Sequence, residues 1–390
     1  MAGSSTVGHG SAETSVRDPS TTGEPEARHG GNLVASARRL GCRPEQLLDA
    51  SASLVPFGPP APVRLLLRQA LGARAGRPSP LRDYPDRSYQ RLREAIAAAH
   101  GLDPAAVLPG NGAAELFTWA ARDAAATGTS WLPTPGFADY PRALACWGGS
   151  WQSLPLPLGG PFPAAGEGGR GRDGDGNDAI WITNPHNPTG QLWSRSSLEP
   201  LLERFALVIV DEAFLPLVPG GEADSLIPLL ADHANLIVIR SLTKLFAIAG
   251  LRLGYALAAP ERLKRWAAWR DPWPVNGLAA AVGEAVVGDR RWQERVRRWV
   301  AKEGPWLAGQ LSGLSGLRPL PSAANFLLVQ GEGSLLGLRE RLESRQRILL
   351  RDCRSFEGLG ENWLRIGLQD RRGNQRILRA MRTELARKMR

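Results

Sequence analysis

Residues 241–255 read SLTKLFAIAGLRLGY, and they form the most specific motif in the sequence. Its lysine, Lys244, follows an apolar run, with Ser241 three residues before it and Arg252 eight residues after it. A lysine that forms a Schiff base must be reachable and must lose its proton, so it belongs at a strand end inside a crevice. A hydroxyl and a guanidinium together suit a phosphate group. A bare S-x-T-K would describe a solvated loop lysine equally well, whereas the extended S-x-T-K-x-x-x-I-x-G-x-R-x-G indicates a cofactor site.

On both sides of this motif, short apolar runs alternate with segments in which the apolar residues have helical spacing. The runs occupy residues 131–132, 179–182, 206–210, 236–239 and 254–257. Such alternation indicates an α/β fold whose mostly parallel sheet is covered by helices on both faces. In such sheets the polar residues just past the strand ends line the ligand crevice.

Three polar segments follow or precede these runs. Asn184-Pro185-His186-Asn187-Pro188-Thr189-Gly190 follows the second run, and Asp211 ends the third, 33 residues before Lys244. A Gly-rich turn at 110–112 precedes a helix expected over 113–125, and backbone N–H groups at a helix start bind anions. Each segment also has a common structural explanation, because Asn-Pro pairs make turns and an acid after a strand often caps a helix. Because all three segments lie at the ends of expected strands, we favour a role in ligand binding over these structural explanations.

The rest of the chain divides by composition and pattern. Helices are expected over 33–40 and 88–100, and the Gly-rich segment 159–177 is expected to be a mobile surface insertion. After about residue 284 the pattern becomes helix 284–311, strand 324–329, helix 335–345, short strands near 348 and 364, and a helix from 375. The predicted division is a disordered segment 1–28, an N-terminal arm 29–62 that packs with the small domain, a large domain 63–283 and a small α+β domain 284–390.

Composition narrows the class of protein. No apolar run approaches the roughly 20 residues of a membrane helix, and the N-terminus lacks signal-peptide features, so we expect a cytoplasmic protein without a membrane partner. The three cysteines are scattered without a CxxC pair, which predicts neither a metal site nor a disulfide framework. The formal charge of +10 comes almost entirely from arginine spread along the chain, since only four lysines occur. Because clustering marks nucleic-acid binding, no nucleic-acid partner is expected.

The segment around Lys244 closely resembles the attachment signature of the class I/II aminotransferases, and the resemblance extends over residues 29–390. It implies the fold type I architecture of pyridoxal 5'-phosphate (PLP) enzymes, with a large domain and a small C-terminal domain. It also implies PLP as the cofactor, Lys244 as its attachment point, and a homodimer with shared active sites. Asp211 matches the family aspartate beside the pyridine nitrogen, where a carboxylate keeps the ring protonated and able to accept electrons.

Further roles follow from the same resemblance. Asn187 would donate to the cofactor's phenolic oxygen, Phe137 would stack on its ring, and Tyr84 would reach the cofactor phosphate of the neighbouring subunit. The catalytic residues implied are Lys244 and Asp211. The cofactor-binding residues implied are Gly112, Ala113, Phe137, Asn187, Asp211, Ser241, Lys244, Arg252 and Tyr84.

Within the family the chain most resembles the threonine-phosphate decarboxylases of the corrinoid pathway, and next the histidinol-phosphate aminotransferases. The residues responsible are His29-Gly30-Gly31-Asn32, Phe214 in Asp-Glu-Ala-Phe, and Leu349-Leu350-Arg351-Asp352-Cys353. The resemblance implies a phosphorylated amino acid as substrate, bound by His29, Arg351 and Arg365. Ser53 and Val55 depart from the decarboxylases' asparagines, which leaves transamination open. A PLP-binding transcription regulator is a further alternative, but residues 1–28 are too short and polar for a helix-turn-helix.

Overall fold

The computed structural model describes residues 30–72, 76–163 and 177–388. The predictions of a disordered segment 1–28, of a role for His29 and of mobility in most of the insertion 159–177 therefore lie outside the described residues. Within the described part of the chain, no helix combines the length and the apolar character needed to cross a membrane.

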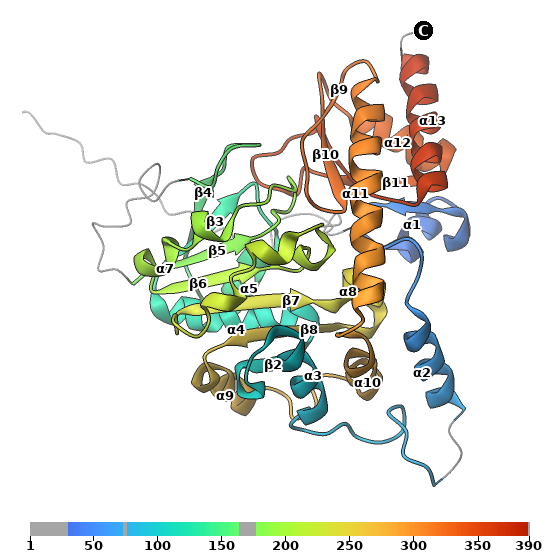
Figure 1. The fold of residues 1–390 in the computed structure, drawn as a ribbon. Coiled ribbons are helices and arrows are strands. Elements are labelled where there is room, and N and C mark those ends of the chain that lie inside the picture. Colours follow the sequence, from blue (N-terminus) through green and yellow to red (C-terminus); the bar gives the residue numbers. More distant parts are fainter. Residues whose placement is uncertain (1–29, 73–75, 164–176, 389–390) are drawn as a thin grey trace, which may run out of the picture.

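A seven-stranded sheet forms the centre of the larger half of the molecule (Figure 1). Its strand order is β2-β8-β7-β6-β5-β3-β4. The strands are β2 (Val107–Asn111), β3 (Ser130–Thr134), β4 (Trp151–Pro155), β5 (Ala179–Thr183), β6 (Leu207–Asp211), β7 (Leu236–Ser241) and β8 (Leu253–Ala258). The pairs from β4 to β7 are parallel, and only β8 runs antiparallel to its two neighbours, β7 and β2. The predicted mostly parallel sheet is thus confirmed.

Helices cover both faces of this sheet, which explains why its central strands are apolar without alternation. Val208 and Val210 of β6 belong to one hydrophobic cluster, while Leu207 and Ile209 belong to another. The first cluster includes side chains of α3 (Gln90–His100), α10 (Gly277–Val286) and α11 (Arg290–Ser312). The second includes side chains of α4 (Gly112–Thr127), α5 (Asp139–Ala145) and α9 (Pro260–Trp269). Successive strand residues point to opposite faces, so both sets of apolar side chains are buried.

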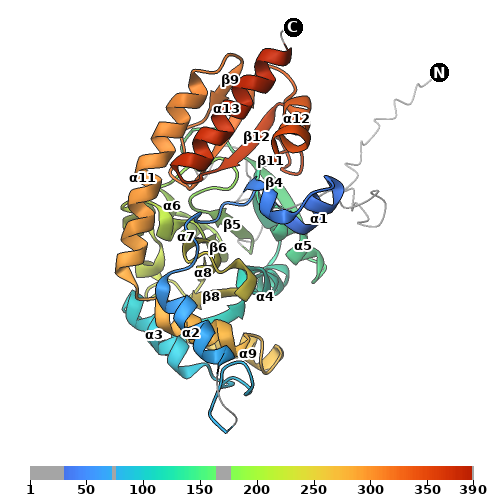
Figure 2. The ribbon, with the colours of Figure 1, turned by 90° about the vertical axis from the view of Figure 1, so that its right-hand side faces the viewer.

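A second, five-stranded sheet lies at the C-terminal end of the molecule, with the order β1-β11-β12-β10-β9. Its strands are β1 (Leu48–Ala50), β9 (Leu317–Pro319), β10 (Phe326–Gly331), β11 (Ile348–Asp352) and β12 (Trp363–Gly367). The helices α12 (Leu336–Gln346) and α13 (Arg371–Lys388) pack with α11 against it. Strand β1 comes from the N-terminal arm and pairs in parallel with β11, so the arm is built into this sheet (Figure 2).

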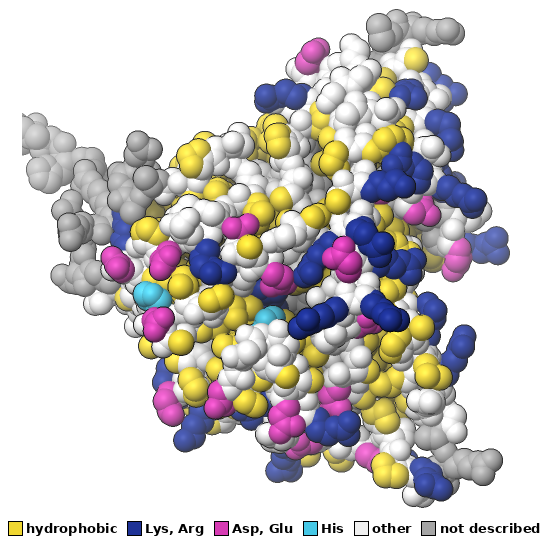
Figure 3. Space-filling model, viewed as in Figure 1, with side chains coloured by type: hydrophobic (Ala, Val, Ile, Leu, Met, Phe, Trp, Pro, Cys, Tyr) yellow, Lys and Arg dark blue, Asp and Glu magenta, His cyan; other side chains and the backbone are white. Residues whose placement is uncertain are grey.

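The arm continues past the large sheet. It contains α1 (Leu33–Arg39) beside the small sheet and α2 (Ala61–Leu71), which packs against α10 (Figure 2). Three further short helices, α6 (Arg195–Leu198), α7 (Leu201–Arg204) and α8 (Leu242–Leu245), complete the α-helical elements of the described residues. Arginine side chains gather over α11 and α13 together with acidic ones (Figure 3). Beneath this surface the buried Glu384 of α13 pairs with Arg341, Arg345 and Arg387.

Two local predictions were wrong. The turn expected at 110–112 is the end of strand β2, because Gly110 and Asn111 pair with Gly254 and Leu253 of β8, and α4 begins directly at Gly112. The single helix expected over 284–311 is two helices, since α10 ends at Val286 and α11 begins after Asp289, whose side chain accepts the Trp292 N–H at 3.0 Å. A side-chain cap of this kind starts a new helix.

Candidate active site

The polar segments singled out in the sequence meet at the carboxyl edge of the large sheet. Asp211 ends β6, and Ser241 ends the neighbouring strand β7. Thr183, the last residue of β5, is the register partner of Asp211, so the segment from Asn184 to Asn187 begins beside that aspartate. Parallel strands bring their carboxyl ends to one edge, and that edge is where ligands bind in open α/β sheets.

Lys244 lies in α8, the single helical turn that follows β7. Its Nζ donates a hydrogen bond to Ser241 Oγ at 3.4 Å and lies 5.3 Å from the centroid of the Phe214 ring. Burial lowers the pKa of Lys244, and the charges of Arg252 and Arg365 lower it further, while Asp211 opposes the shift. A larger share of this amine is therefore neutral and nucleophilic near neutral pH than is usual for lysine.

Asp211 is a buried carboxylate with two hydrogen-bond donors. Its Oδ1 accepts the Ala213 N–H at 2.9 Å, and its Oδ2 accepts the Tyr140 hydroxyl at 2.8 Å. Burial raises the pKa of Asp211, although Lys244 and both hydrogen bonds oppose the rise. A cationic group beside this carboxylate would lower its pKa again, so the site is suited to a protonated ring nitrogen.

Sequence reasoning missed Tyr140. It is buried in α5, and its hydroxyl contacts both Asp211 and Thr183 Oγ1, the latter at 2.7 Å. Burial raises its pKa well above the usual range, so the phenol stays protonated and donates to Asp211. No helical spacing linked Tyr140 to Phe137 in the sequence, because Phe137 lies two residues before α5 begins at Asp139.

A cradle for an anion lies at the start of α4. Gly112 has φ +74°, and a Cβ added there would lie 2.5 Å from Arg252 Nη2. Gly254 packs as closely, since a Cβ there would lie 2.8 Å from the Ala113 nitrogen, and Gly254 is the register partner of Ser241. The glycines therefore allow the helix start, a hydroxyl and a guanidinium to converge. Together these are the donors that bind a phosphate.

Two arginines enter the site from the small sheet. Arg351 of β11 and Arg365 of β12 are register partners. Arg365 Nη1 donates to Asn187 Oδ1, and its Nη2 donates to the Ser51 carbonyl at 3.2 Å. Arg351 Nη2 donates to Ser355 Oγ at 2.6 Å. Burial lowers the pKa of Arg365 to about 10 and also lowers that of Arg351, so both cations favour an anionic ligand.

The contact with Arg365 orients the Asn187 amide. Because Asn187 Oδ1 accepts from Arg365, its Nδ2 is left as a donor, which is the group expected to reach the cofactor's phenolic oxygen. Arg365 thereby joins the small sheet to the loop after β5 of the large sheet. Sequence patterns do not show a contact of this kind.

The arm contributes backbone groups at the positions where the expected asparagines are missing. The Ser51 carbonyl accepts from Arg365, and the Ser53 carbonyl accepts from Asn325 Nδ2 at 2.9 Å. Ser53, Val55 and Asn325 are all buried. Since these contacts use backbone oxygens, they do not depend on the side chains at 53 and 55. Asn325 was not among the predicted site residues.

Phe137 and Tyr84 are predicted cofactor-binding residues that lie outside the hydrogen-bonded groups described above. Phe137 is partly buried in the segment just before α5, with its ring centroid 5.5 Å from that of Tyr140. Tyr84 is 80% exposed and stacks on Trp273 at a centroid distance of 4.5 Å, so it does not contact the site of its own chain. An exposed tyrosine is compatible with contact to a second subunit.

His186 lies inside the loop after β5 and gives a pH-dependent prediction. Its Nδ1 pairs with Thr189 Oγ1 at 2.8 Å, and burial lowers the pKa of His186 to about 3. The pKa of histidine in the unfolded chain is about 6.5, so between pH about 3 and pH about 6.5 the unfolded chain binds more protons than the folded one. The free energy of unfolding therefore falls as the pH falls through this window.

Replacing His186 removes this effect. From pH 7 to pH 5, the free energy of unfolding of His186→Asn should fall by about 2 kcal/mol less than that of the parent.

Denaturant unfolding of both proteins at pH 7 and pH 5 measures this difference. The histidine at position 100 is present in both proteins, so its own titration cancels. Equal losses of stability in parent and variant would show that His186 takes up a proton while folded.

These residues fit pyridoxal 5'-phosphate. The cradle at Gly112 and Arg252 suits its phosphate, Lys244 has the lowered pKa needed to bond to its aldehyde carbon, and buried Asp211 suits a protonated ring nitrogen. Among the described residues, no cluster of three or more histidine, cysteine, aspartate or glutamate side chains is arranged to hold a metal ion.

Comparisons with known proteins agree with this site. A family model described as "Aminotransferase class I and II" matches residues 62–381. A threonine-phosphate decarboxylase of Salmonella typhimurium is 35% identical over 92% of this chain and 96% of its own length.

Solved structures agree as well. A histidinol-phosphate aminotransferase from Clostridium acetobutylicum superposes with a TM-score of 0.78 at 26% identity, over 87% of this chain and 100% of that one. An L-threonine-O-3-phosphate decarboxylase from Porphyromonas gingivalis superposes with a TM-score of 0.75 at 25% identity, over the same shares. The chain therefore belongs to the class I and II aminotransferase family of PLP-dependent enzymes.

Proposed function

We propose that this enzyme decarboxylates threonine phosphate to aminopropanol phosphate and carbon dioxide, as a step of cobalamin biosynthesis. The observation that carries the proposal is the pair of buried register partners Arg351 and Arg365, of which Arg365 donates to Asn187 and lowers the pKa of Lys244 by its charge. Threonine phosphate has two anionic groups, a carboxylate and a phosphate, and two guanidinium groups suit them. The identity to the Salmonella typhimurium decarboxylase over nearly both whole chains supports the same substrate.

The cofactor, when bound, supplies a ring that delocalises the electron pair released at the substrate's Cα. Asp211 holds a proton at the ring nitrogen, and Tyr140 holds Asp211 in place through its 2.8 Å hydrogen bond. Gly112, Ala113, Ser241 and Arg252 bind the phosphate, Asn187 donates to the phenolic oxygen, and Phe137 stacks on the ring. Lys244 would hold the cofactor through its amine.

The substrate's orientation selects the bond that breaks. Arg351 and Arg365 would fix this orientation by holding the substrate's two anionic groups, so that the bond to the carboxylate is the one that breaks. Lys244, whose Nζ lies 5.3 Å from the centroid of the Phe214 ring, would supply the proton that Cα takes up in place of carbon dioxide.

Phe214 and Phe326 line the same crevice with apolar surface. Their rings pack edge to face with centroids 5.1 Å apart, and Arg365 lies over the Phe326 ring at 4.8 Å. Lys244 lies over the Phe214 ring at 5.3 Å, so both cations face this apolar surface, which would limit the access of water to them. A dry site strengthens the hold of the arginines on the anionic groups.

The proposal includes a homodimer with shared active sites. Tyr84, which is 80% exposed in the single chain, would bind the cofactor phosphate of the neighbouring subunit.

The proposal also includes the division of the chain into an arm 29–62, a large domain 63–283 and a small domain 284–390. The two sheets and the pairing of β1 with β11 support this division.

The test of the reaction uses two separate mixtures. With threonine phosphate alone we expect carbon dioxide and aminopropanol phosphate, because decarboxylation needs no keto-acid acceptor. With histidinol phosphate and 2-oxoglutarate we expect no glutamate. The opposite pair of results would establish the aminotransferase alternative, which the superposition on the Clostridium acetobutylicum enzyme favours.

Substrate binding has its own matched control. Arg365→Gln should raise KM for threonine phosphate by at least about a hundredfold, since one buried charge-assisted contact is lost. Arg354→Gln changes an exposed arginine that is ion-paired with Asp352 at 2.7 Å, and should leave KM within about twofold.

A further inference from the structure

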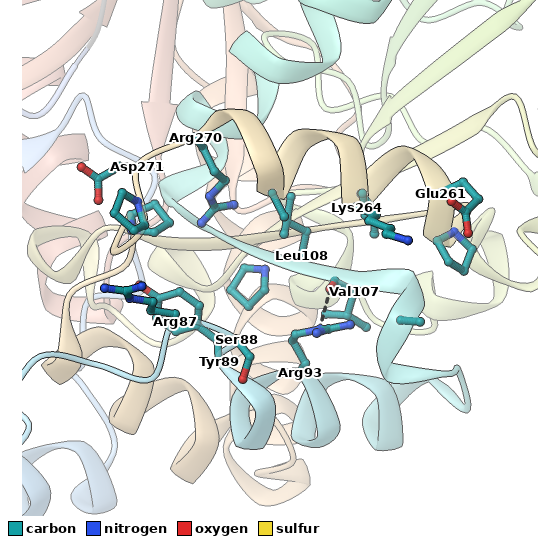
Figure 4. A pocket seen from close by; sticks show the side chains of 17 residues that line it. Arg87, Ser88, Tyr89, Arg93, Val107, Leu108, Glu261, Lys264, Arg270 and Asp271 are labelled. Carbon is teal, nitrogen blue, oxygen red and sulfur yellow. Dashed lines mark hydrogen bonds between the residues drawn. The ribbon is translucent and has the colours of Figure 1, made fainter.

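A cavity of about 510 Å³ lies apart from the site described above, between α9 and the segment that leads into α3 (Figure 4). The edge strand β2 forms its floor through Val107, Leu108 and Pro109. Arg270, at the C-terminal end of α9, contributes its guanidinium, which Figure 4 shows directed into the space between these elements. None of the residues to which a catalytic or cofactor-binding role is given above lines this cavity.

Arg270 is a buried cation with incomplete compensation. Its side chain is only 4% exposed, and its acidic partner, Glu115 of α4, is 3.4 Å away through Nε. The Glu115 carboxylate already accepts the Asn111 N–H at 2.6 Å and the Trp119 indole N–H at 3.2 Å. Nη1 of Arg270 has no hydrogen-bond partner. Burial lowers the pKa of Arg270, and the charges of Glu115, Tyr89 and Asp271 offset this effect only in part.

The charged groups around the cavity favour a negative ligand. The cations that line it are Arg87, Arg93, Lys264 and Arg270, and the acids are Glu261 and Asp271. Arg93 is occupied by the carbonyls of Pro104 and Val107. Figure 4 shows Asp271 directed away from the Arg270 guanidinium and Glu261 at the far end of α9. Figure 4 shows Lys264 at that far end as well, near Glu261, so the cations on the Arg270 side of the cavity are Arg87 and Arg270 itself.

We propose that this cavity is a binding site for a small phosphate-bearing anion, held by Arg270 with Lys264 and Arg87 at its rim. A buried polar group without a partner in a native protein calls for a bound water or ion, and a guanidinium binds phosphate oxygens in a bidentate geometry. An anion here would complete the compensation that Glu115 only begins. The site is distinct from the cradle at Gly112, although Glu115 contacts both Arg270 and the Asn111 N–H before that cradle.

The test is calorimetric titration of inorganic pyrophosphate into the PLP-loaded enzyme at low ionic strength. Loading fills the cofactor's phosphate cradle, and the titration is repeated with Arg365→Gln to remove anion binding by the substrate arginines. We expect binding at one site per chain that persists in Arg365→Gln. Arg270→Gln should weaken it roughly tenfold or more, since a buried charge-assisted contact is lost.

Arg265→Gln is the matched control, because Arg265 lies on the same helix, is exposed and does not line the cavity. It should change the affinity less than about twofold. Should Arg270→Gln fail to fold, the rim variant Arg87→Gln/Lys264→Gln must weaken binding and reduce its salt dependence. The proposal is overturned if Arg270→Gln leaves the affinity for pyrophosphate unchanged. It is also overturned if Arg365→Gln alone removes the binding, a result that would leave the proposed reaction unaffected.

Discussion

Lys244→Ala is expected to abolish turnover and to leave the cofactor bound without a covalent link. Lys244 is the lysine at the carboxyl edge of the large sheet, its pKa is lowered by burial, and it lies beside both Asp211 and Arg365. Without its amine the enzyme loses both the cofactor bond and the acid that returns a proton to Cα. We expect kcat to fall at least about a thousandfold, equivalent to about 4 kcal/mol in the barrier.

Spectroscopy separates this result from simple misfolding. The parent protein should absorb in the visible band of a lysine-bound cofactor, and borohydride should fix the cofactor to the peptide that contains Lys244. The variant should bind the cofactor reversibly and show no fixation. Lys302→Ala, at an exposed position on α11, is the control and should behave as the parent. Fixation at Lys264, Lys302 or Lys388 in the parent would contradict the assignment of Lys244.

Asp211→Ala should lower kcat by roughly a hundredfold or more, a few kcal/mol in the barrier. The carboxylate is buried at the end of β6 and is held by the Ala213 N–H and the Tyr140 hydroxyl. Its loss removes the anion that keeps the ring nitrogen protonated, so electrons released at Cα are less well accommodated. Asp211→Asn should be affected nearly as much, because an amide keeps the shape but not the charge.

Tyr140→Phe distinguishes positioning from direct contact with the cofactor. It leaves the Asp211 charge in place and removes one hydrogen bond, so we expect a fall in kcat of about tenfold. The pH at which the cofactor's absorbance changes should also shift in Tyr140→Phe, which a purely structural role would not cause.

For the Asp211 prediction, near-normal turnover of Asp211→Ala with bound cofactor would show that another group holds the ring nitrogen.

Much of the fold was predictable because its determinants are local. Each apolar run that was predicted as a strand of the large sheet forms one, namely β3, β5, β6, β7 and β8, since unbroken apolar runs between helices can be buried only in a covered sheet. Strand β4 (Trp151–Pro155) was not predicted. Strand β2 was missed because Pro109 and Gly110 are typical of turns, and only the pairing with β8 makes them a strand. The break between α10 and α11 was missed because the Asp289 cap lies within a continuous helical pattern.

The sequence alone determined that the sheet is mostly parallel and that Asn187, Asp211 and Lys244 follow the ends of its strands. Strand burial and the topology of parallel sheets fix these features through short-range patterns. Tertiary structure alone decided that Arg365 orients Asn187, 178 residues away, and that Tyr140 holds Asp211, 71 residues away. Contacts between distant segments depend on how helices and sheets pack, and that packing is a property of the whole core, so no local pattern records it.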